Sequence, residues 1–396
     1  MNLKLASSLL FDSSLTKKIE EIGGATASLC YQCGTCTASC PLGVQVRKLL
    51  RDIQLGATDD AVGDSNVWSC ATCKLCELEC PRGVNITDIL HSLRVLAFEA
   101  RKVPQKLEQA LWGIYEQGNP HGGNKNERGK WAEGLNVPLA GNGKKSAKYL
   151  LYAGCAASYD PRLQNIARSV VEVLQKANAQ VSILGENESC CGDVVFQIGE
   201  EGFLEELVEK NVKTFNESEA ETLITLSPHC LNMFKNIYPH YGTMPNVVHY
   251  TEVFSQFIDH GDLEINRIAS DNNSGGREEN VRTTYHDPCY LGRYYGIYEE
   301  PRKILESIPG LTLTEMKDNR ENALCCGGGG GQMWNENTTA RPSHERVTQA
   351  FESAPVLATS CPYCIQNFED AAKTKGLELK VTDVSELLNR SLKPKL

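Results

Sequence analysis

The sequence lacks a long hydrophobic run, a basic stretch and a convincing export signal. Its longest apolar segments, such as YLLYAGCAA at 149–157, fall well short of the roughly 20 residues needed to span a bilayer. A net charge of −10, with acidic and basic residues mixed along the chain, argues against nucleic acid as a partner. The first residues, MNLKLASSLLF, contain no clear apolar core or cleavage site. We therefore expect a cytoplasmic protein that reaches the inner face of a membrane only through a partner subunit.

A nucleotide-binding signature is lacking as well. No GxGxxG motif follows a strand-like segment, and the five-glycine run at 327–331 lacks the GK[ST] continuation of a phosphate-binding loop. The chain is therefore not expected to accept a hydride from a flavin or nicotinamide itself. Its electrons must come from a partner protein.

Cysteine, by contrast, is abundant. The chain has 17 cysteines, which without a secretory signal indicate metal binding or catalysis rather than a disulfide framework. Eight of them form two C-x2-C-x2-C-x3-C-P runs, at 30–41 and 70–81. In bacterial two-cluster ferredoxins the fourth cysteine of such a run ligates the other cluster. We therefore predict two 4Fe-4S cubanes, one held by Cys30, Cys33, Cys36 and Cys80 and the other by Cys70, Cys73, Cys76 and Cys40. Zinc is the alternative, but zinc sites usually use two CxxC pairs separated by a longer loop.

The other nine cysteines lie in a pattern that occurs twice. The first copy has Cys155, the pair Cys190–Cys191 and Cys230, and the second has Cys289, the pair Cys325–Cys326, Cys361 and Cys364. Corresponding gaps differ by one residue, so that Ser227 stands where the second copy has Cys361. Short apolar strands alternate with helical segments, which predicts parallel α/β layers with each cysteine at the carboxyl end of a strand.

These patterns predict a multidomain protein that combines α+β and α/β architecture. A mainly helical, two-cluster ferredoxin-like domain is expected over 1–115, followed by a Gly- and Asn-rich linker over 116–147. Two repeated parallel α/β domains, related by pseudo-twofold symmetry, are expected over 148–270 and 281–396, with a second linker over Asp271–Asn280.

The C…CCG…CxxC pattern resembles the cysteine-rich CCG domain of heterodisulfide reductases. The domain order resembles their D-type subunit, and is similar to the iron–sulfur subunits of glycolate, lactate and anaerobic glycerol-3-phosphate oxidoreductases. The resemblance implies a noncubane 4Fe-4S cluster that cleaves a disulfide, with ligands and catalytic thiols Cys289, Cys325, Cys326, Cys361 and Cys364. Gly327 and Gly328 are expected to let backbone N–H groups approach the cluster sulfides. A flexible loop after a structural zinc site is the alternative.

The first copy departs from this pattern at Ser227. A serine oxygen is a harder and poorer ligand for iron than a thiolate. For the set Cys155, Cys190, Cys191 and Cys230, three interpretations remain: a modified noncubane cluster, an ordinary four-cysteine cluster, or no cluster.

Three further residues near the cysteines are candidates for supporting roles. His286 is a candidate proton donor to a leaving thiolate, or else a hydrogen-bond partner that supports a ligand. Arg293 is a candidate partner for an anionic substrate group, or else an ordinary arginine. His229, beside Cys230, is a candidate to tune or ligate the altered cluster. Trp68 and Trp334 are expected to pack near the ligands and keep water out.

Two functions follow from these predictions. In the first, the chain is an enzyme subunit that reduces or forms a disulfide of small thiols, such as coenzyme M and coenzyme B, or of a protein. In the second, it is an electron relay without a substrate of its own. Both need a flavoprotein or a membrane cytochrome b-type subunit as partner, and the relay would connect such a donor to a quinone pool. The complete five-cysteine set favours the first function, and the missing cysteine favours the second.

Overall fold

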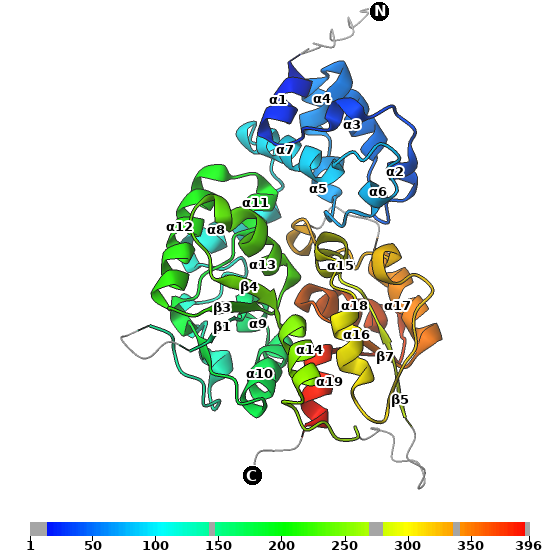
Figure 1. Cartoon of the computed structure of the whole chain (residues 1–396). Helices are drawn as coiled ribbons and strands as arrows, with labels where there is room; N and C mark the ends of the chain where they lie inside the picture. Colours follow the sequence, from blue (N-terminus) through cyan, green and yellow to red (C-terminus); the bar gives the residue numbers. More distant parts are fainter. Residues whose placement is uncertain (1–13, 142–146, 269–279, 336–340, 393–396) are drawn as a thin grey trace, which may run out of the picture.

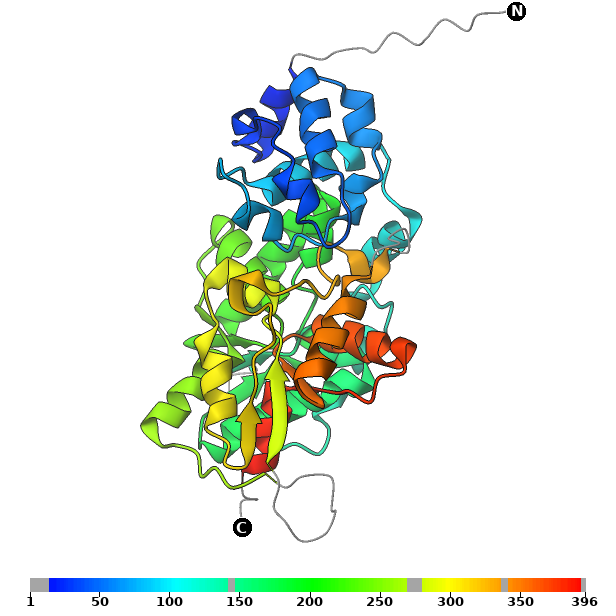
Figure 2. The same cartoon turned by 90° about the vertical axis from the view of Figure 1, so that its right-hand side faces the viewer.

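The structure is a computed structural model, and it describes residues 14–141, 147–268, 280–335 and 341–392. A helical domain lies at one end of the molecule, and two α/β domains lie side by side below it (Figure 1). The view turned by 90° shows the same elongated arrangement (Figure 2). The predicted fold class is confirmed.

The helical domain is built around the two ferredoxin-like runs. Each run turns through a left-handed residue, Gly34 or Lys74, directly before a four-residue helix. A longer helix then follows the Cys-Pro end of each run. The helices of this region are α1 (Leu15–Ile22), α2 (Thr35–Ala38), α3 (Val46–Leu55), α4 (Thr58–Gly63), α5 (Asn66–Ser69), α6 (Leu75–Leu78), α7 (Ile86–Glu99) and α8 (Gln105–Gln117).

The first α/β domain contains a parallel sheet of order β2-β1-β3-β4, with helices on both faces. The strand β1 is buried at all four positions, as expected for a parallel strand covered on both sides. The elements are β1 (Tyr149–Tyr152), α9 (Gly154–Tyr159), α10 (Pro161–Lys176), β2 (Val181–Ile183), α11 (Asp193–Ile198), α12 (Glu201–Glu217), β3 (Thr222–Thr225), α13 (Pro228–Asn232), β4 (Asn246–His249) and α14 (Tyr250–His260).

The second α/β domain repeats this topology, with a parallel sheet of order β6-β5-β7-β8. The main difference follows the cysteine pair, where the glycine run and a short 3-10 turn at Gln332–Trp334 replace α11. The elements are β5 (Val281–Tyr285), α15 (Cys289–Tyr295), α16 (Glu299–Glu306), β6 (Leu311–Leu313), α17 (Pro342–Ser353), β7 (Val356–Thr359), α18 (Pro362–Lys375), β8 (Lys380–Asp383) and α19 (Val384–Ser391).

The two α/β domains pack through equivalent elements. Helix α10 packs on α19 and α14 packs on α16, while α9 contacts α18 and α13 contacts α15. Helices α9, α10, α13 and α14 of the first domain correspond to α15, α16, α18 and α19 of the second. Each contact therefore has a counterpart in which the two domains are interchanged, which is the pattern of a twofold interface. Polar contacts reinforce it: Arg162 binds Glu369 and Glu386, and Tyr250 Oη donates to Asp383 at 2.7 Å. The packing therefore supports the predicted pseudo-twofold relation.

A continuous hydrophobic core joins the helical domain to the α/β domains. Leu93 of α7, Val195 of α11 and Leu291 of α15 are fully buried members of the same cluster. Helix α8 also packs on α11, so that it extends beside the first α/β domain. The helical domain is therefore fixed to the other two by packing and not by a single connection.

The segment 116–147, expected as a linker, connects α8 to β1. Its central part packs on the first α/β domain, where Arg128 and Trp131 are buried. Residues 142–146 and most of the second expected linker, Asp271–Asn280, lie outside the described residues. Within the described ranges, no helix combines the length and the apolar character that a bilayer crossing requires.

Candidate iron–sulfur centres

The first predicted cubane set comes together near the surface of the helical domain. Cys30, Cys33, Cys36 and Cys80 line one pocket. Cys33 is exposed, and the neighbouring Tyr31 is 59% exposed. The fold therefore brings Cys80 to the other run, as the ferredoxin-like spacing predicts.

The second predicted cubane set lies deeper. Cys40, Cys70, Cys73 and Cys76 line a separate pocket, and the last three are buried. The fourth cysteine of the first run thus crosses to the second pocket. The exchange of cysteines that the spacing predicts is present in the fold, while ligation itself stays a prediction.

The cysteines of the first α/β domain also meet. Cys155, Cys190, Cys191 and Cys230 line one pocket together with Ser227. Ser227 caps the N-terminus of α13 after β3, and Cys361 holds the same position before α18 after β7. The correspondence between Ser227 and Cys361, inferred from spacing, is therefore present in the structure.

The five cysteines of the second α/β domain are buried and joined by sulfur contacts. Cys364 Sγ lies 3.3 Å from Cys326 Sγ, and Cys325 is hydrogen-bonded to both Cys289 and Cys326. Cys361 is hydrogen-bonded to Cys364. Hydrogen bonds from Cys325 and Cys364 lower the pKa of Cys326 well below its usual range. This favours the thiolate, which is the form that binds metals.

The glycine run has two roles in the fold. Gly327 N and Gly328 N donate to the sulfurs of Cys325 and Cys326 at 3.2 and 3.4 Å, while an approach to cluster sulfides stays a prediction. The second role was not expected from the sequence. A Cβ at Gly329 would lie 2.4 Å from Ala71 O, and one at Gly330 only 2.2 Å from Cys70 O. The run therefore lets the loop that carries Cys70, Cys73 and Cys76, called the second cubane loop below, pack directly on the second α/β domain.

Further contacts hold this cubane loop in place. Thr72 Oγ1 lies 2.6 Å from Tyr290 Oη, and the Thr72 carbonyl accepts from Tyr294 Oη at 2.7 Å. The Cys73 and Cys325 thiols each affect the pKa of the other, which places the two predicted cluster sites close together.

Arg293 connects the same two regions. Its guanidinium donates to the carbonyls of Cys73, Glu321 and Ala323 at 2.5, 2.8 and 2.8 Å. Its Nη2 atom is buried and has no protein hydrogen-bond partner. Most of the guanidinium therefore contacts backbone carbonyls, and the expected pairing of Arg293 with an anionic substrate group stays a prediction.

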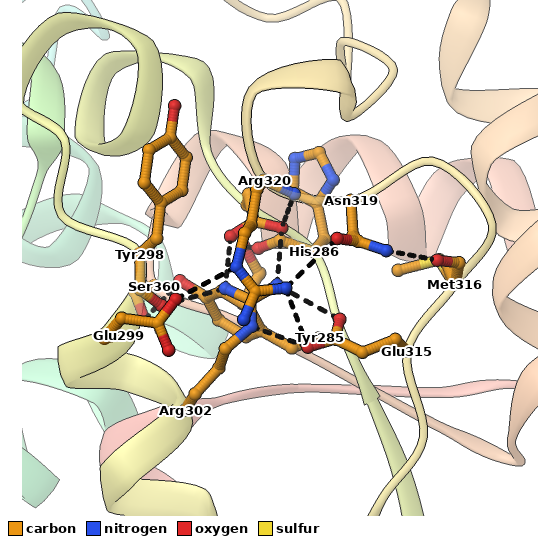
Figure 3. A network of polar contacts seen from close by, with 12 residues as sticks. Tyr285, His286, Tyr298, Glu299, Arg302, Glu315, Met316, Asn319, Arg320 and Ser360 are labelled. Atoms are coloured by element: carbon orange, nitrogen blue, oxygen red, sulfur yellow. Dashed lines mark hydrogen bonds and ion pairs between the residues drawn. The ribbon is translucent and has the colours of Figure 1, made fainter.

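His286 is in a poor position to donate a proton. It is buried, and its Nδ1 atom accepts from Arg346 Nε at 3.1 Å. Burial and the charge of Arg346 lower the pKa of His286 well below its usual value. Below it, Arg302 centres a polar network with Glu315 and Arg320 (Figure 3). His286 therefore has a buried hydrogen-bond partner in Arg346, and both roles considered for it stay predictions.

His229 lies between the two CCG cysteine sets. It lines the pocket of the first set, its Nδ1 is 3.3 Å from Asp193 Oδ2, and its ring lies 4.1 Å from that of Tyr290, next to Cys289. A tuning or ligating role stays a prediction. Trp68 is buried and Trp334 packs edge-on to Tyr363, in line with the expected packing role.

The donor sets of the two predicted cubanes fit iron–sulfur clusters, because four thiols line each pocket and surround a shared space. Arg94, 1% exposed, donates to Cys70 O at 2.8 Å and to Gly330 O at 3.1 Å. A buried cation needs a compensating negative charge, and a thiolate-ligated cluster beside Cys70 would supply it.

Arg94 and a second buried arginine, Arg128, were not found by sequence reasoning. Arg128 contacts the sulfur of Cys155 and pairs with Glu188. No motif marks either arginine, because each reaches its site through the tertiary packing of a helix or of the Gly-rich segment.

Comparison with known proteins agrees with this architecture. The cysteine-rich domain family (CCG) matches twice, at residues 149–235 and 283–369, and the 4Fe-4S dicluster domain family matches residues 29–84. The chain therefore contains two CCG cysteine-rich domains and one 4Fe-4S dicluster domain, and the resemblance to CCG-domain proteins noted from its cysteine spacing is confirmed.

Three relatives illustrate the range of the class. The probable iron–sulfur-binding oxidoreductase FadF of Bacillus subtilis is 38% identical over 76% of this chain and 42% of its own length. The EtfAB:quinone oxidoreductase of Syntrophomonas wolfei is 32% identical over 73% of this chain and 41% of its own. The D subunit of the dihydromethanophenazine:CoB–CoM heterodisulfide reductase of Methanosarcina mazei is 28% identical over 73% and 68%. The chain thus spans less than half the length of the first two.

Proposed function

We propose that this chain carries electrons through two 4Fe-4S cubanes to a noncubane 4Fe-4S cluster held by the second CCG set, where a disulfide is reduced or formed. The direct packing of the loop around Cys70 and Cys73 on the second CCG domain carries this proposal, because Arg293 donates to Cys73 O at 2.5 Å and Gly330 lies against Cys70 O. Electron tunnelling falls off steeply with distance, and this packing keeps the two predicted cluster sites close together. The second set is therefore the natural destination of electrons from the second cubane.

The burial of the two cubane sets gives the path a direction in space. Cys33 of the first set is exposed, whereas Cys73 of the second is buried against the α/β domain. A partner is accordingly expected to exchange electrons at the first cubane. The expected partners are a flavoprotein or a membrane cytochrome b-type subunit, through which the chain would lie at the inner face of a membrane.

The chain's own groups prepare the second set for thiol–disulfide chemistry. A bound 4Fe-4S cluster would supply one-electron redox chemistry and an iron centre with affinity for sulfur. Five buried thiols would hold this group, and the N–H groups of Gly327 and Gly328 face the sulfurs of Cys325 and Cys326. Arg293 Nη2, which is buried and has no protein hydrogen-bond partner, would pair with an anionic group of a thiol substrate. Cleavage of a disulfide takes two electrons, so the path must deliver twice per turnover.

A pure relay is the second candidate, and Ser227 favours it. With one thiol fewer in the first set, a mechanism that needs two equivalent noncubane clusters loses support. The names of the relatives divide in the same way, since one is an EtfAB:quinone oxidoreductase and another belongs to a heterodisulfide reductase. In the relay, electrons would pass between a flavoprotein dehydrogenase and a membrane cytochrome or quinone pool.

The test combines iron counting with spectroscopy under anaerobic conditions. Two cubanes give about 8 iron atoms per chain, one further four-iron cluster about 12, and two about 16. A paramagnetic signal that appears on oxidation only with an added small thiol, and is lost in Cys326→Ala while both cubanes remain reducible, is the expected result. If Cys326→Ala keeps the thiol response, the disulfide site is wrong. About 8 iron atoms with no thiol response would leave the relay.

A further inference from the structure

A buried ion pair lies against the first CCG cysteine set. Arg128, 1% exposed, follows the 3-10 turn Lys125–Glu127 in the segment between α8 and β1. Its guanidinium donates to Glu188 Oε1 from Nε at 3.2 Å and from Nη2 at 2.8 Å. Both Nη atoms also lie 3.5 Å from Cys155 Sγ. The positive charge of Arg128 therefore lies next to the sulfur of Cys155, a candidate iron ligand.

The position of this guanidinium is fixed on every side. Arg128 also donates to Gly118 O at 3.1 Å and to Ser189 O at 3.2 Å. Glu188 in turn accepts from the N–H groups of Ala153 and Gly154 at 3.0 and 2.9 Å. Turning away from the sulfur would leave several buried polar groups unpaired, at a cost of about 1–3 kcal/mol each. The ion pair thus holds the loops before Cys155 and Cys190 together.

The second CCG set also has an arginine beside it, but this arginine lies on a helix of the domain itself. Arg293 of α15 donates to the carbonyls of Ala323, before the Cys325–Cys326 pair, and of Cys73 in the second cubane loop. Arg128 donates to the carbonyls of Ser189, before Cys190, and of Gly118. Among the hydrogen bonds described, Arg128 reaches a cysteine sulfur and Arg293 does not, although the charge of Arg293 also acts on Cys289 and Cys325. The direct contact between guanidinium and sulfur is therefore what distinguishes the first set.

We propose that the first CCG set holds an iron–sulfur cluster, and that Arg128 is a positioning residue that raises its reduction potential through the hydrogen bonds to the Cys155 sulfur. Hydrogen bonds to ligand sulfurs and the local net charge both set cluster potentials. A reduced cluster carries one more negative charge, which a buried cation beside the sulfur favours. Glu188 fixes the guanidinium and offsets part of its charge. This inference extends the proposed function but concerns the other cysteine set.

The test is a potentiometric titration of the full chain, with dithionite as the one-electron reductant and clusters followed by electron paramagnetic resonance. The signal of the first set is the one that Cys191→Ala removes. Arg128→Gln is expected to lower its midpoint so that the reduced-to-oxidised ratio at a fixed potential falls at least tenfold, which is about 59 mV for one electron. Arg128→Lys keeps the charge and should shift it less. Glu188→Gln should shift it in the opposite direction.

Arg302→Gln is the matched control. Arg302 forms a comparable buried pair, 2.6 Å from Asp287, and lies in the polar network of Figure 3. Its loss should leave the first-set potential unchanged, with iron content and thermal unfolding measured in parallel. An equal shift in Arg302→Gln, no shift in Arg128→Gln, or no signal that Cys191→Ala removes would each overturn the proposal. If Arg128→Gln fails to retain iron, a lowered or unchanged potential in Glu188→Gln overturns it.

These outcomes are separate from those of the proposed function. The thiol response is assigned to the second set and is read in Cys326→Ala. A failure at Arg128 leaves that response in place, and a missing thiol response leaves the potential of the first set measurable.

Discussion

Gly330→Ala should disturb the junction between the second cubane loop and the second CCG set. Gly330 has a φ of +59°, and a Cβ there would lie 2.2 Å from Cys70 O and 3.1 Å from Ala71 Cα. The left-handed backbone alone costs alanine about 1–2 kcal/mol. Overpacking against backbone that cannot rotate away adds about 1–3 kcal/mol. We expect a loss of about 2–5 kcal/mol in the free energy of unfolding and slower electron transfer out of the second cubane.

Gly376→Ala separates the two contributions. Gly376 ends α18 with a φ of +64°, and a Cβ there meets nothing within 4 Å. It therefore carries the backbone strain without the clash. Chemical unfolding gives the stability of both variants, and stopped-flow reduction by dithionite gives the rate at which the second CCG set is reduced. If the two variants have the same stability and the same rate, close packing at Gly330 does not hold the junction.

Two further predictions concern buried charges. Arg293→Gln removes hydrogen bonds to the carbonyls of Cys73 and Ala323, so it should lower the free energy of unfolding by about 2–4 kcal/mol and slow reduction of the second set. The control Arg341→Gln breaks an exposed ion pair with Asp370 and should cost below about 1 kcal/mol. Equal losses in the two variants would contradict the role of Arg293 in joining these segments. Burial raises the pKa of Asp383 to about 7. The folded state then holds a proton that the unfolded state releases near its ordinary pKa of about 3.9, so this contribution to stability is complete below about pH 4 and is lost as the pH rises through 7, by at most about 1.4 kcal/mol per pH unit. Asp383→Asn should flatten that part of the pH profile of the unfolding midpoint, and identical profiles for both proteins would refute it.

The cysteine sets were accessible to sequence reasoning because their ligands lie close together in the chain. Spacing alone placed Cys80 with the first run and Ser227 opposite Cys361, and the fold brings each to that place. The parallel direction of the strands also follows from alternating short strands and helices, since parallel strands need crossover connections. Local pattern was sufficient for these features.

The polar groups around the sets were not accessible in the same way. Arg94 lies in the middle of α7 and Arg128 in a segment that reads as a linker, yet both contact cysteine loops distant in sequence. The role of His286 was open for a related reason, because the sequence does not show that Arg346 donates to it. Such contacts depend on how domains dock, which short-range pattern does not encode.

The hydrophobic core shared by the helical domain and the two α/β domains also bears on how the proposed electron path would work. Leu93, Val195 and Leu291 belong to one buried cluster that joins the three domains. If electrons enter at the first cubane as proposed, no separate movement of the helical domain is needed to bring them to the second CCG set. A more viscous solvent should then slow the encounter with the partner, and not the transfer between sites that this core holds together.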